Sequence, residues 1–331
     1  MEIKIRNAIL HVLNNDIGTS LMSQEELDID SETCYEFITR HVKKLLSNHA
    51  VKEATFNSGS RVYEIVSALK NGQMNFKDAS REIGERLFDV MLKSVEIPSA
   101  DVLVTLFNIK SDTYLAVLKL NYKECFMHEI RGEADAQLVK CRTVLPFDGG
   151  KVDEACLIPY EPMVVKLIEK QYPIDGEERN YFSELFLECS AAISKKDVVS
   201  IIKEVSDDII RKYYEDDIQG AARVKNSLVQ EAEEGDGSIN FRSVATKAFG
   251  SNPEIVDEYV SLLDQAGLKA EIEIDERYVR QQFGTQRIKA DNGVEVKLPS
   301  YLLENDDAVR IINNSDGTIS IHLNRLCNLT S

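Results

Sequence analysis

Residues 102–120 read VLVTLFNIKSDTYLAVLKL, two apolar runs separated by a short polar segment. Val102–Ile109 and Tyr114–Leu120 are rich in β-branched and aromatic side chains, which favour strands. The four residues from Lys110 to Thr113 leave room only for a tight reversal of the chain. The stretch therefore predicts an antiparallel hairpin, and we infer the fold of the N-terminal half from it.

The elements around this hairpin predict an α+β fold in which helices pack on an N-terminal antiparallel sheet. Apolar residues recur at helical spacing before the hairpin and at strand spacing after it. The turn-like Asp148-Gly149-Gly150 lies between the last two strands of this part. In chain order we predict a strand at 3–13, helices from Asp30 or Ser31 onward, at 62–69 and at 76–93, the hairpin, and strands at 137–145 and 155–158.

The sequence after Tyr172-Pro173 changes to a helical pattern and ends in short hairpins. We place a domain boundary here, giving an N-terminal α+β domain at 1–173 and a helical region followed by C-terminal β-hairpins at 174–331. Asn292-Gly293 is the strongest hairpin signal in the chain. The elements predicted in this part are helical segments at 181–189, 198–229, 240–249 and 253–266, a loop at 231–237, and hairpins at 286–298 and 310–323.

The charge balance restricts the partners that the protein can bind. The chain has 56 Asp and Glu residues against 39 Lys and Arg residues, a formal net charge of −17. Averaged over the surface, such a field repels nucleic acid and anionic lipid. Any contact with phosphate must therefore come from a local cluster of cations, and it would weaken as salt is added.

The sequence predicts a cytosolic protein that does not associate with membranes. No apolar run approaches the roughly 18 residues that a bilayer span needs. The first residues, Met1 to Arg6, lack the basic start and apolar core of a signal peptide. The six cysteines contain no Cys-x-x-Cys pair, so we expect reduced thiols and neither a zinc ribbon nor a redox dithiol.

Motifs of catalysis and cofactor binding are missing from the sequence. It contains no phosphate-binding loop, no dinucleotide fingerprint and no Gly-x-Ser-x-Gly elbow. Cys125 and His128 form the only close Cys/His pair, and a metal site there would need two more ligands. We expect no catalytic residue, no metal and no cofactor. An unrecognised hydrolase stays open, because it requires polar side chains that converge in one pocket.

Two groups of cations are candidates for phosphate contact. Arg40, Lys43 and Lys44 lie opposite the apolar stripe of the first helix, near its C-terminus, where they either complement the helix dipole or meet phosphate. The second group consists of Arg277, Arg280, Arg287, Lys289 and Lys297. Tyr278, Phe283 and Gln281-Gln282 are interleaved with these cations in the sequence.

The predicted hairpin arranges part of the second group. Arg287 and Lys289 alternate on one strand face, and Lys297 joins them across the hairpin. This face is the most plausible surface for phosphate, and an ordinary solvated hairpin is the alternative.

Residues 240–266 have the outline of a helix-turn-helix, a second possible route to DNA. The helix in the recognition position carries Glu254, Asp257, Glu258 and Asp264 and no Lys or Arg. Phosphates on both sides of the major groove would repel it. We therefore reject this interpretation.

Several collinear stretches resemble one bacterial family. They are NAILHVL at 7–13, YLAVLKL at 114–120, Tyr181-Phe182 followed by Phe186-Leu187 and Cys189, and IEID at 272–275 before a short helix, a basic hairpin and a closing hairpin with Asp316-Gly317. In their order and spacing, the chain resembles the NdpA-type, or 37-kDa, nucleoid-associated proteins. Its own mass is 37.4 kDa.

The resemblance implies association with the bacterial chromosome, a homodimer and no enzymatic activity. The resulting hypothesis is a nucleoid-associated protein that contacts chromosomal DNA independently of sequence, through the second group of cations. The alternative is an acidic protein-interaction module that reaches the nucleoid through DNA-handling partner proteins.

Overall fold

The computed structural model describes residues 2–130, 136–147, 149–214, 217–250, 252–305, 307–315 and 317–324. The chain divides into two compact units, Met1–Ser194 and Lys195–Ser331. The first contains a large antiparallel sheet with helices, and the second contains helices followed by short hairpins. This confirms the predicted α+β class.

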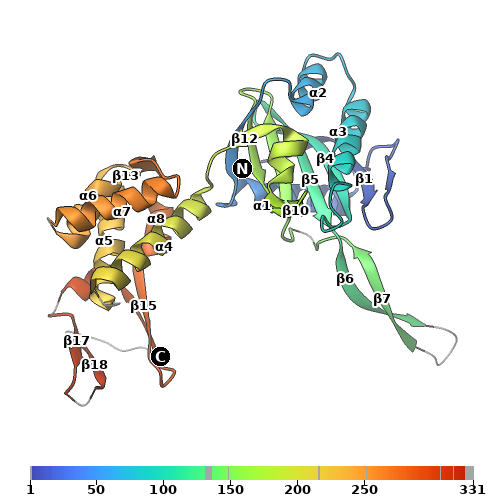
Figure 1. The fold of residues 1–331 in the computed structure, drawn as a ribbon. Coiled ribbons are helices and arrows are strands. Elements are labelled where there is room, and N and C mark those ends of the chain that lie inside the picture. The colour runs from blue at the N-terminus through green and yellow to red at the C-terminus, as the bar shows by residue number, and fades with distance from the viewer. Residues whose placement is uncertain are drawn as a thin grey trace. The chain divides into compact units, whose positions relative to one another are not determined.

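An eight-stranded antiparallel sheet forms the centre of the first unit (Figure 1). The predicted hairpin supplies β4 and β5, which pair from Ala100 opposite Asn121 to Ile109 opposite Asp112. The predicted N-terminal strand, β1, pairs with β4 on its other side. In spatial order the strands are β12 (Cys189–Ala191), β3 (Lys52–Phe56), β9 (Val164–Ile168), β8 (Glu154–Pro159), β5 (Asp112–Asn121), β4 (Ala100–Ile109), β1 (Lys4–Asn14) and β2 (Thr19–Leu21).

Both faces of the sheet are buried, because a core lies on each side of it and successive side chains of a strand point into one core and then the other. Val102 and Val104 belong to the core on one side, whereas Leu103 and Phe107 belong to the core on the other. Helix α1 (Glu32–Leu46) contributes to the second core. Helices α2 (Arg61–Lys70) and α3 (Phe76–Met91) contribute to the first.

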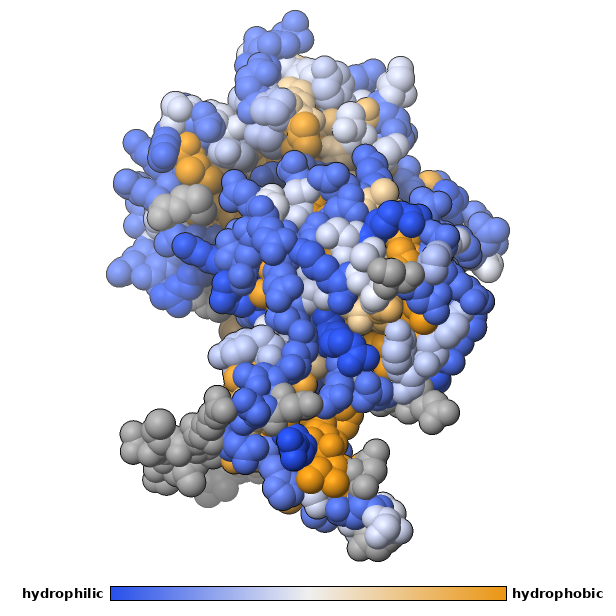
Figure 2. Space-filling model, turned by 90° about the vertical axis from the view of Figure 1, so that its left-hand side faces the viewer, coloured by the Kyte–Doolittle hydropathy of each residue, from blue (hydrophilic) through white to orange (hydrophobic). Residues whose placement is uncertain are grey.

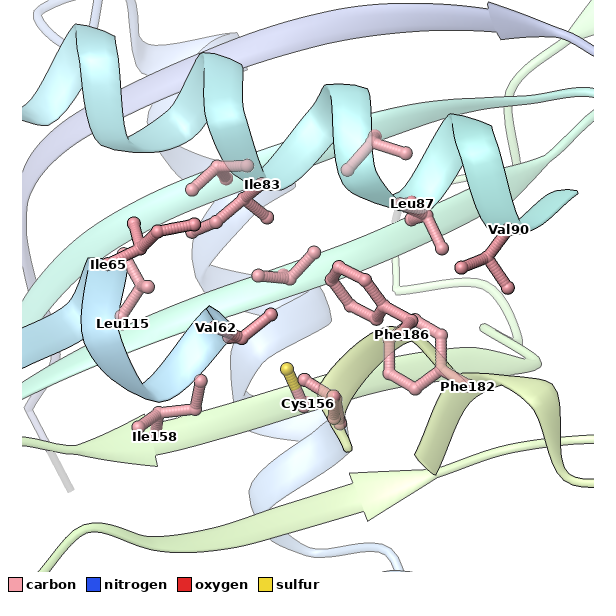
Figure 3. Close-up of a cluster of buried hydrophobic side chains, with 14 of the residues drawn as sticks. Val62, Ile65, Ile83, Leu87, Val90, Leu115, Cys156, Ile158, Phe182 and Phe186 are labelled. Carbon is pink, nitrogen blue, oxygen red and sulfur yellow. The ribbon is translucent and has the colours of Figure 1, made fainter. Parts of the chain in front are cut away.

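Figure 3 shows the first of these cores. Ile65 of α2 and Ile83 of α3 point toward the strands beneath them. Side-chain caps begin both helices, since Ser60 accepts a hydrogen bond from the Tyr63 N–H and Asn75 accepts one from the Asp78 N–H. Such caps satisfy amide donors that the first helical turn leaves without partners.

The segment after Tyr172-Pro173 belongs to the first unit. It forms β10 (Tyr172–Ile174), β11 (Glu177–Arg179) and a π-helix, η1 (Phe182–Leu187), before β12 joins the sheet. Phe182 and Phe186 of η1 are fully buried in the core of Figure 3. The first compact unit therefore extends to Ser194, because these aromatic side chains complete its core.

Strands β6 (Lys123–Ile130) and β7 (Ala136–Val144) form a separate two-stranded ribbon, which we call the arm. It extends away from the body of the first unit in Figure 1. The sequence predicted a strand at 137–145 and a turn leading to 155–158. Both strands exist, but β7 pairs with β6, which the sequence analysis did not predict.

The second unit begins with two amphipathic helices in place of the single long pattern predicted at 198–229. Helix α4 spans Lys195–Tyr214 and α5 spans Ile218–Glu234, and the Asp217 side chain caps α5 by accepting from the N–H groups of Gln219 and Gly220. The predicted loop at 231–237 is shorter than expected, because α5 continues through Glu234. Gly237 has φ +92°, and a Cβ there would lie 3.0 Å from the carbonyl oxygen of Ile274.

The remaining elements of this unit pack around α5. Buried side chains of α4 to α8 form one core, and a smaller core lies beneath the hairpins. These elements are β13 (Ser238–Asn240), α6 (Phe241–Phe249), α7 (Pro253–Gln265), β14 (Glu271–Glu273), α8 (Glu276–Phe283), β15 (Thr285–Lys289), β16 (Glu295–Pro299), the 3-10 helix η2 (Ser300–Glu304), β17 (Val309–Asn313) and β18 (Ile319–Leu323).

One ion pair is buried inside the first unit. Lys119 of β5 lies opposite Glu154 of β8, with 3.7 Å between Nζ and Oε2 and no exposed side-chain area on either residue. Asn121 accepts a hydrogen bond from Lys119 and donates one of 2.9 Å to Glu154. Burial lowers the pKa of Lys119 to about 8, although the charge of Glu154 acts to raise it.

We predict that Lys119→Met lowers the free energy of unfolding by about 3–5 kcal/mol, because it leaves the Glu154 carboxylate buried without its counter-ion. Adding Glu154→Gln recovers most of this loss. Lys166→Met is the matched control on β9, since Lys166 is half exposed and lies 3.9 Å from Glu53; its effect stays below about 1 kcal/mol. Urea unfolding measures all three, and equal losses for Lys119→Met and Lys166→Met would contradict the prediction.

Candidate nucleic-acid interface

The β15–β16 hairpin carries three of the predicted phosphate contacts. Its turn contains Asn292-Gly293, with Gly293 at φ +86°, a conformation that glycine adopts without strain. The Asn292 side chain accepts a hydrogen bond from the Val294 N–H, and the Ala290 N–H donates to the Val294 carbonyl. The Asn-Gly hairpin predicted from the sequence is confirmed.

Alternation along the two strands separates a buried face from a charged face. Ile288 and Leu298 are buried in the small core that also contains Ala222 of α5. Arg287, Lys289 and Lys297 are exposed, and Arg287 lies directly opposite Lys297. The structure thus brings these three cations onto one surface, which we call the basic hairpin face.

One carboxylate partly neutralises this face. Glu295 lies opposite Lys289, with its oxygens 3.2 Å from Arg287 Nη2 and 3.9 Å from Lys289 Nζ. Because the side chains of Arg287 and Lys289 are each about 70% exposed, solvent screens both pairs. Lys297 contacts no carboxylate within the part of the chain that the structure describes. Three cations and one acid leave a local excess of positive charge.

Helix α8 holds the other two predicted residues of this group. Arg277 is exposed and has no ion pair with a described residue. Arg280 contacts Glu233 of α5 and Glu276 one turn earlier, so its charge is engaged within the unit. Tyr278 and Phe283 are buried in the core and cannot stack on bases. Their interleaving with the cations reflects helix packing.

Two lysines near the hairpin were missed by the sequence analysis. Lys225 of α5 donates a hydrogen bond to the Gln286 side chain, and Lys203 of α4 donates one of 3.3 Å to Gln282. Burial lowers the pKa of Lys225; Asp207 acts to raise it and Lys203 to lower it further. One feature of the sequence could have indicated that Lys225 is available for another contact. No acidic residue lies three or four positions away from it on its helix, where an ion pair would form.

The cations of α1 lie in the first unit, and two of them have partners. Arg40 pairs with Glu36 at 2.7 Å, and Lys44 donates a 2.7 Å hydrogen bond to the carbonyl oxygen of Gly149. Lys43 is exposed. Lys43 and Lys44 also lie in the last turn of α1, where positive charge complements the helix dipole. The structure therefore gives this group a local role that needs no phosphate.

The helices α6 and α7 have the predicted helix-turn-helix outline. The acids of α7 are partly paired, since Asp257 contacts Arg242 at 2.8 Å and Glu258 contacts Lys212 at 2.7 Å. Glu254 is exposed at the start of α7. These pairs add no cation to the surface of α7 itself, so the physical argument against its entry into a major groove is unchanged.

The comparison with protein families decides the classification. The profile of the family described as nucleoid-associated protein YejK matches residues 9–327. The chain belongs to this family. The resemblance inferred from its collinear motifs is thereby confirmed. No curated protein gives a significant match to the chain.

Hydrophilic side chains predominate on the side drawn in Figure 2, and apolar side chains gather in several groups among them. No three His, Cys, Asp or Glu side chains among the described residues are placed to hold a metal ion. None of the described helices combines the length and apolar character that a bilayer span requires.

We predict that Ile288→Ala destabilises the hairpin and α5 by about 2–4 kcal/mol, because it removes packing from the small core. Arg287→Ala, one position earlier, changes this stability by less than about 0.5 kcal/mol, because the side chain is exposed. Hydrogen exchange of the hairpin and α5 amides measures both variants. A large effect of Arg287→Ala would show that the basic hairpin face is structural.

Proposed function

We propose that this member of the nucleoid-associated family binds duplex DNA without sequence preference through the basic hairpin face. The observation that carries the proposal is the exposure of Arg287, Lys289 and Lys297 on one side of a hairpin whose other side is anchored in a core. In a chain of charge −17, strand alternation and register concentrate positive charge at this place. Arg277 of α8 is a further contact, and the protein acts at the nucleoid without catalysing a reaction.

The spacing of these cations suits a phosphate backbone. Residues two positions apart on a strand are separated by about 6.6 Å, and directly opposite residues have Cβ atoms about 5 Å apart. Long Arg and Lys side chains reach neighbouring phosphates from such positions. An arginine meets phosphate through paired hydrogen bonds and a lysine as a point charge, neither of which reads base identity.

Screening permits this contact despite the acidity of the chain. At physiological ionic strength, exposed charges further apart than about 8 Å interact weakly. The cations that contact DNA lie within that distance of its phosphates, so they act on the DNA more strongly than remote charges do. A homodimer would present two such faces and double the number of contacts, and we include it in the proposal.

We predict that the purified protein binds duplex DNA in a filter-binding assay. A plot of the logarithm of the binding constant against the logarithm of the salt concentration should have a slope of about −3 for each hairpin that contacts DNA. Lys297→Ala lowers the magnitude of this slope by about 0.9 per hairpin and weakens binding about 10-fold, because one charge-assisted contact is lost. Glu295→Gln strengthens binding by freeing Arg287 and Lys289.

Lys269→Ala is the matched control for this series. It removes an exposed lysine from the same unit outside the hairpin, between α7 and β14. Its binding curve should overlay that of the wild type. Absence of binding even at the lowest salt would exclude direct contact, and equal losses for Lys269→Ala and Lys297→Ala would exclude the basic hairpin face.

A protein-interaction module that reaches the nucleoid through DNA-handling partners is the second candidate. It is favoured by the carboxylates that already engage three of the five predicted cations, namely Arg280, Arg287 and Lys289. Acidic surfaces of this chain would then bind basic patches on those partners.

A pull-down with and without nuclease separates the two candidates. Direct binding predicts that chromosomal proteins captured by the immobilised chain disappear when DNA is digested. Partners that persist after digestion, and that are released by added salt, would support the second candidate.

A further inference from the structure

Among the residues that the structure describes, no strand of the main sheet pairs with the arm. β6 and β7 pair only with each other, from Lys123 opposite Val144 to Ile130 opposite Ala136. All eight residues of β6 are exposed, and at the usual rise per residue the ribbon is about 25 Å long. An isolated two-stranded ribbon is marginally stable in water, and a covering layer is what normally stabilises one.

One face of the arm carries a stripe of large apolar side chains. Phe126, Ile130 and Leu138 are 71%, 68% and 79% exposed. Phe126, His128 and Ile130 alternate along β6 and therefore lie on one face. Leu138 is directly opposite His128 on β7, so it lies on the same face. Leu138 is diagonal to both other residues, within reach of long side chains. The stripe therefore runs along the ribbon, and Lys140 and His128 lie on the same face, opposite Phe126 and Leu138.

The charges of the arm argue against nucleic acid as the partner of this stripe. Arms that insert apolar side chains into the minor groove combine them with cations that contact phosphate. Residues 123–142 contain four Lys and Arg and four Asp and Glu, so the arm has no excess positive charge. Three of these acids, Glu129, Glu133 and Asp135, fall within seven residues that contain one cation, Arg131. Phosphates would repel that part of the arm.

We propose that the arm of a second copy of this chain covers this face. Two arms would pack face to face and antiparallel about a two-fold axis, with Phe126 of each copy near Ile130 of the other and the two Leu138 side chains near the axis. Such an isologous contact is self-complementary, since the same residues meet on both sides. Two ribbons in layers then bury an apolar centre as a small β-sandwich does.

The charge sequence of the arm matches this antiparallel alignment. Lys123 and Arg142 lie toward the end nearest the body. Lys140, midway along β7, pairs with Glu124 at 2.6 Å, and Glu124 also lies 3.8 Å from Arg142. The three acids belong to the opposite end in sequence, where with Arg131 they give residues 129–135 a net charge of −2. An antiparallel pair places the acidic end of each arm beside the cationic end of the other, whereas a parallel pair would bring like charges together.

This dimer surface rests on the proposed function, which includes a homodimer. The experiment below tests the dimer and the DNA binding separately. Light scattering coupled to gel filtration, between 1 and 100 µM protein, should give the mass of a dimer at both 0.1 and 0.5 M salt. High salt weakens DNA binding but leaves an apolar interface intact. A salt-stable dimer that fails to bind DNA would refute the proposed function and leave the arm assignment standing.

Phe126→Glu and Leu138→Glu should each raise the dimer dissociation constant at least about 30-fold, as for a central interface side chain. Val95→Glu is the control, because Val95 is a 91% exposed apolar residue in the turn after α3 and should leave the dimer intact. Far-ultraviolet circular dichroism checks that each variant is folded, and Phe126→Ser serves if a charged variant is not.

Three outcomes would overturn the inference. The first is a wild-type monomer throughout the concentration range. The second is a dimer that survives both arm substitutions. The third is an unchanged oligomer whose DNA binding, but not its mass, responds to Phe126→Glu, which would assign the stripe to DNA.

Discussion

Burial of the β4–β5 hairpin on both faces is the constraint on which the first unit depends. Side chains of these strands alternate between two cores, so the sheet requires helices on each side. Helix α1 fills one side, while α2, α3 and η1 fill the other. A charged side chain on such a strand needs a buried partner, and Lys119 has one in Glu154 of the neighbouring strand.

The second unit and the arm use the same strand alternation for different surfaces. In the β15–β16 hairpin, one face packs on α5 and the other displays cations. In the arm, β6 is exposed along its whole length, and one face displays the stripe of Phe126, Ile130 and Leu138. An acidic protein thus displays a cluster of cations on one hairpin and a stripe of apolar side chains on another.

Sequence patterns predicted the elements whose signals are local. The β4–β5 hairpin, the capped helices and the Asn292-Gly293 turn follow from apolar periodicity and turn chemistry within short windows. The place of η1 depends on residues far apart in the chain, and no local pattern contains it. The β6–β7 ribbon is local, but β6 was missed because it has few of the β-branched and aromatic side chains that indicate a strand. The candidate site divides in the same way. Alternation placed Arg287, Lys289 and Lys297 together, whereas the engagement of Arg280 by Glu233 and the approach of Lys225 to Gln286 required the tertiary structure.

The alternation of the β15–β16 hairpin also limits how its sequence can change in length. Deleting one residue within β15 would turn Arg287 toward α5 and expose Ile288, since a shift of one position exchanges the two faces of a strand. Core packing and surface charge would then fail together. Insertions and deletions among relatives should therefore be confined to the turn at 291–293, while the strands themselves diverge only by replacement of one residue with another.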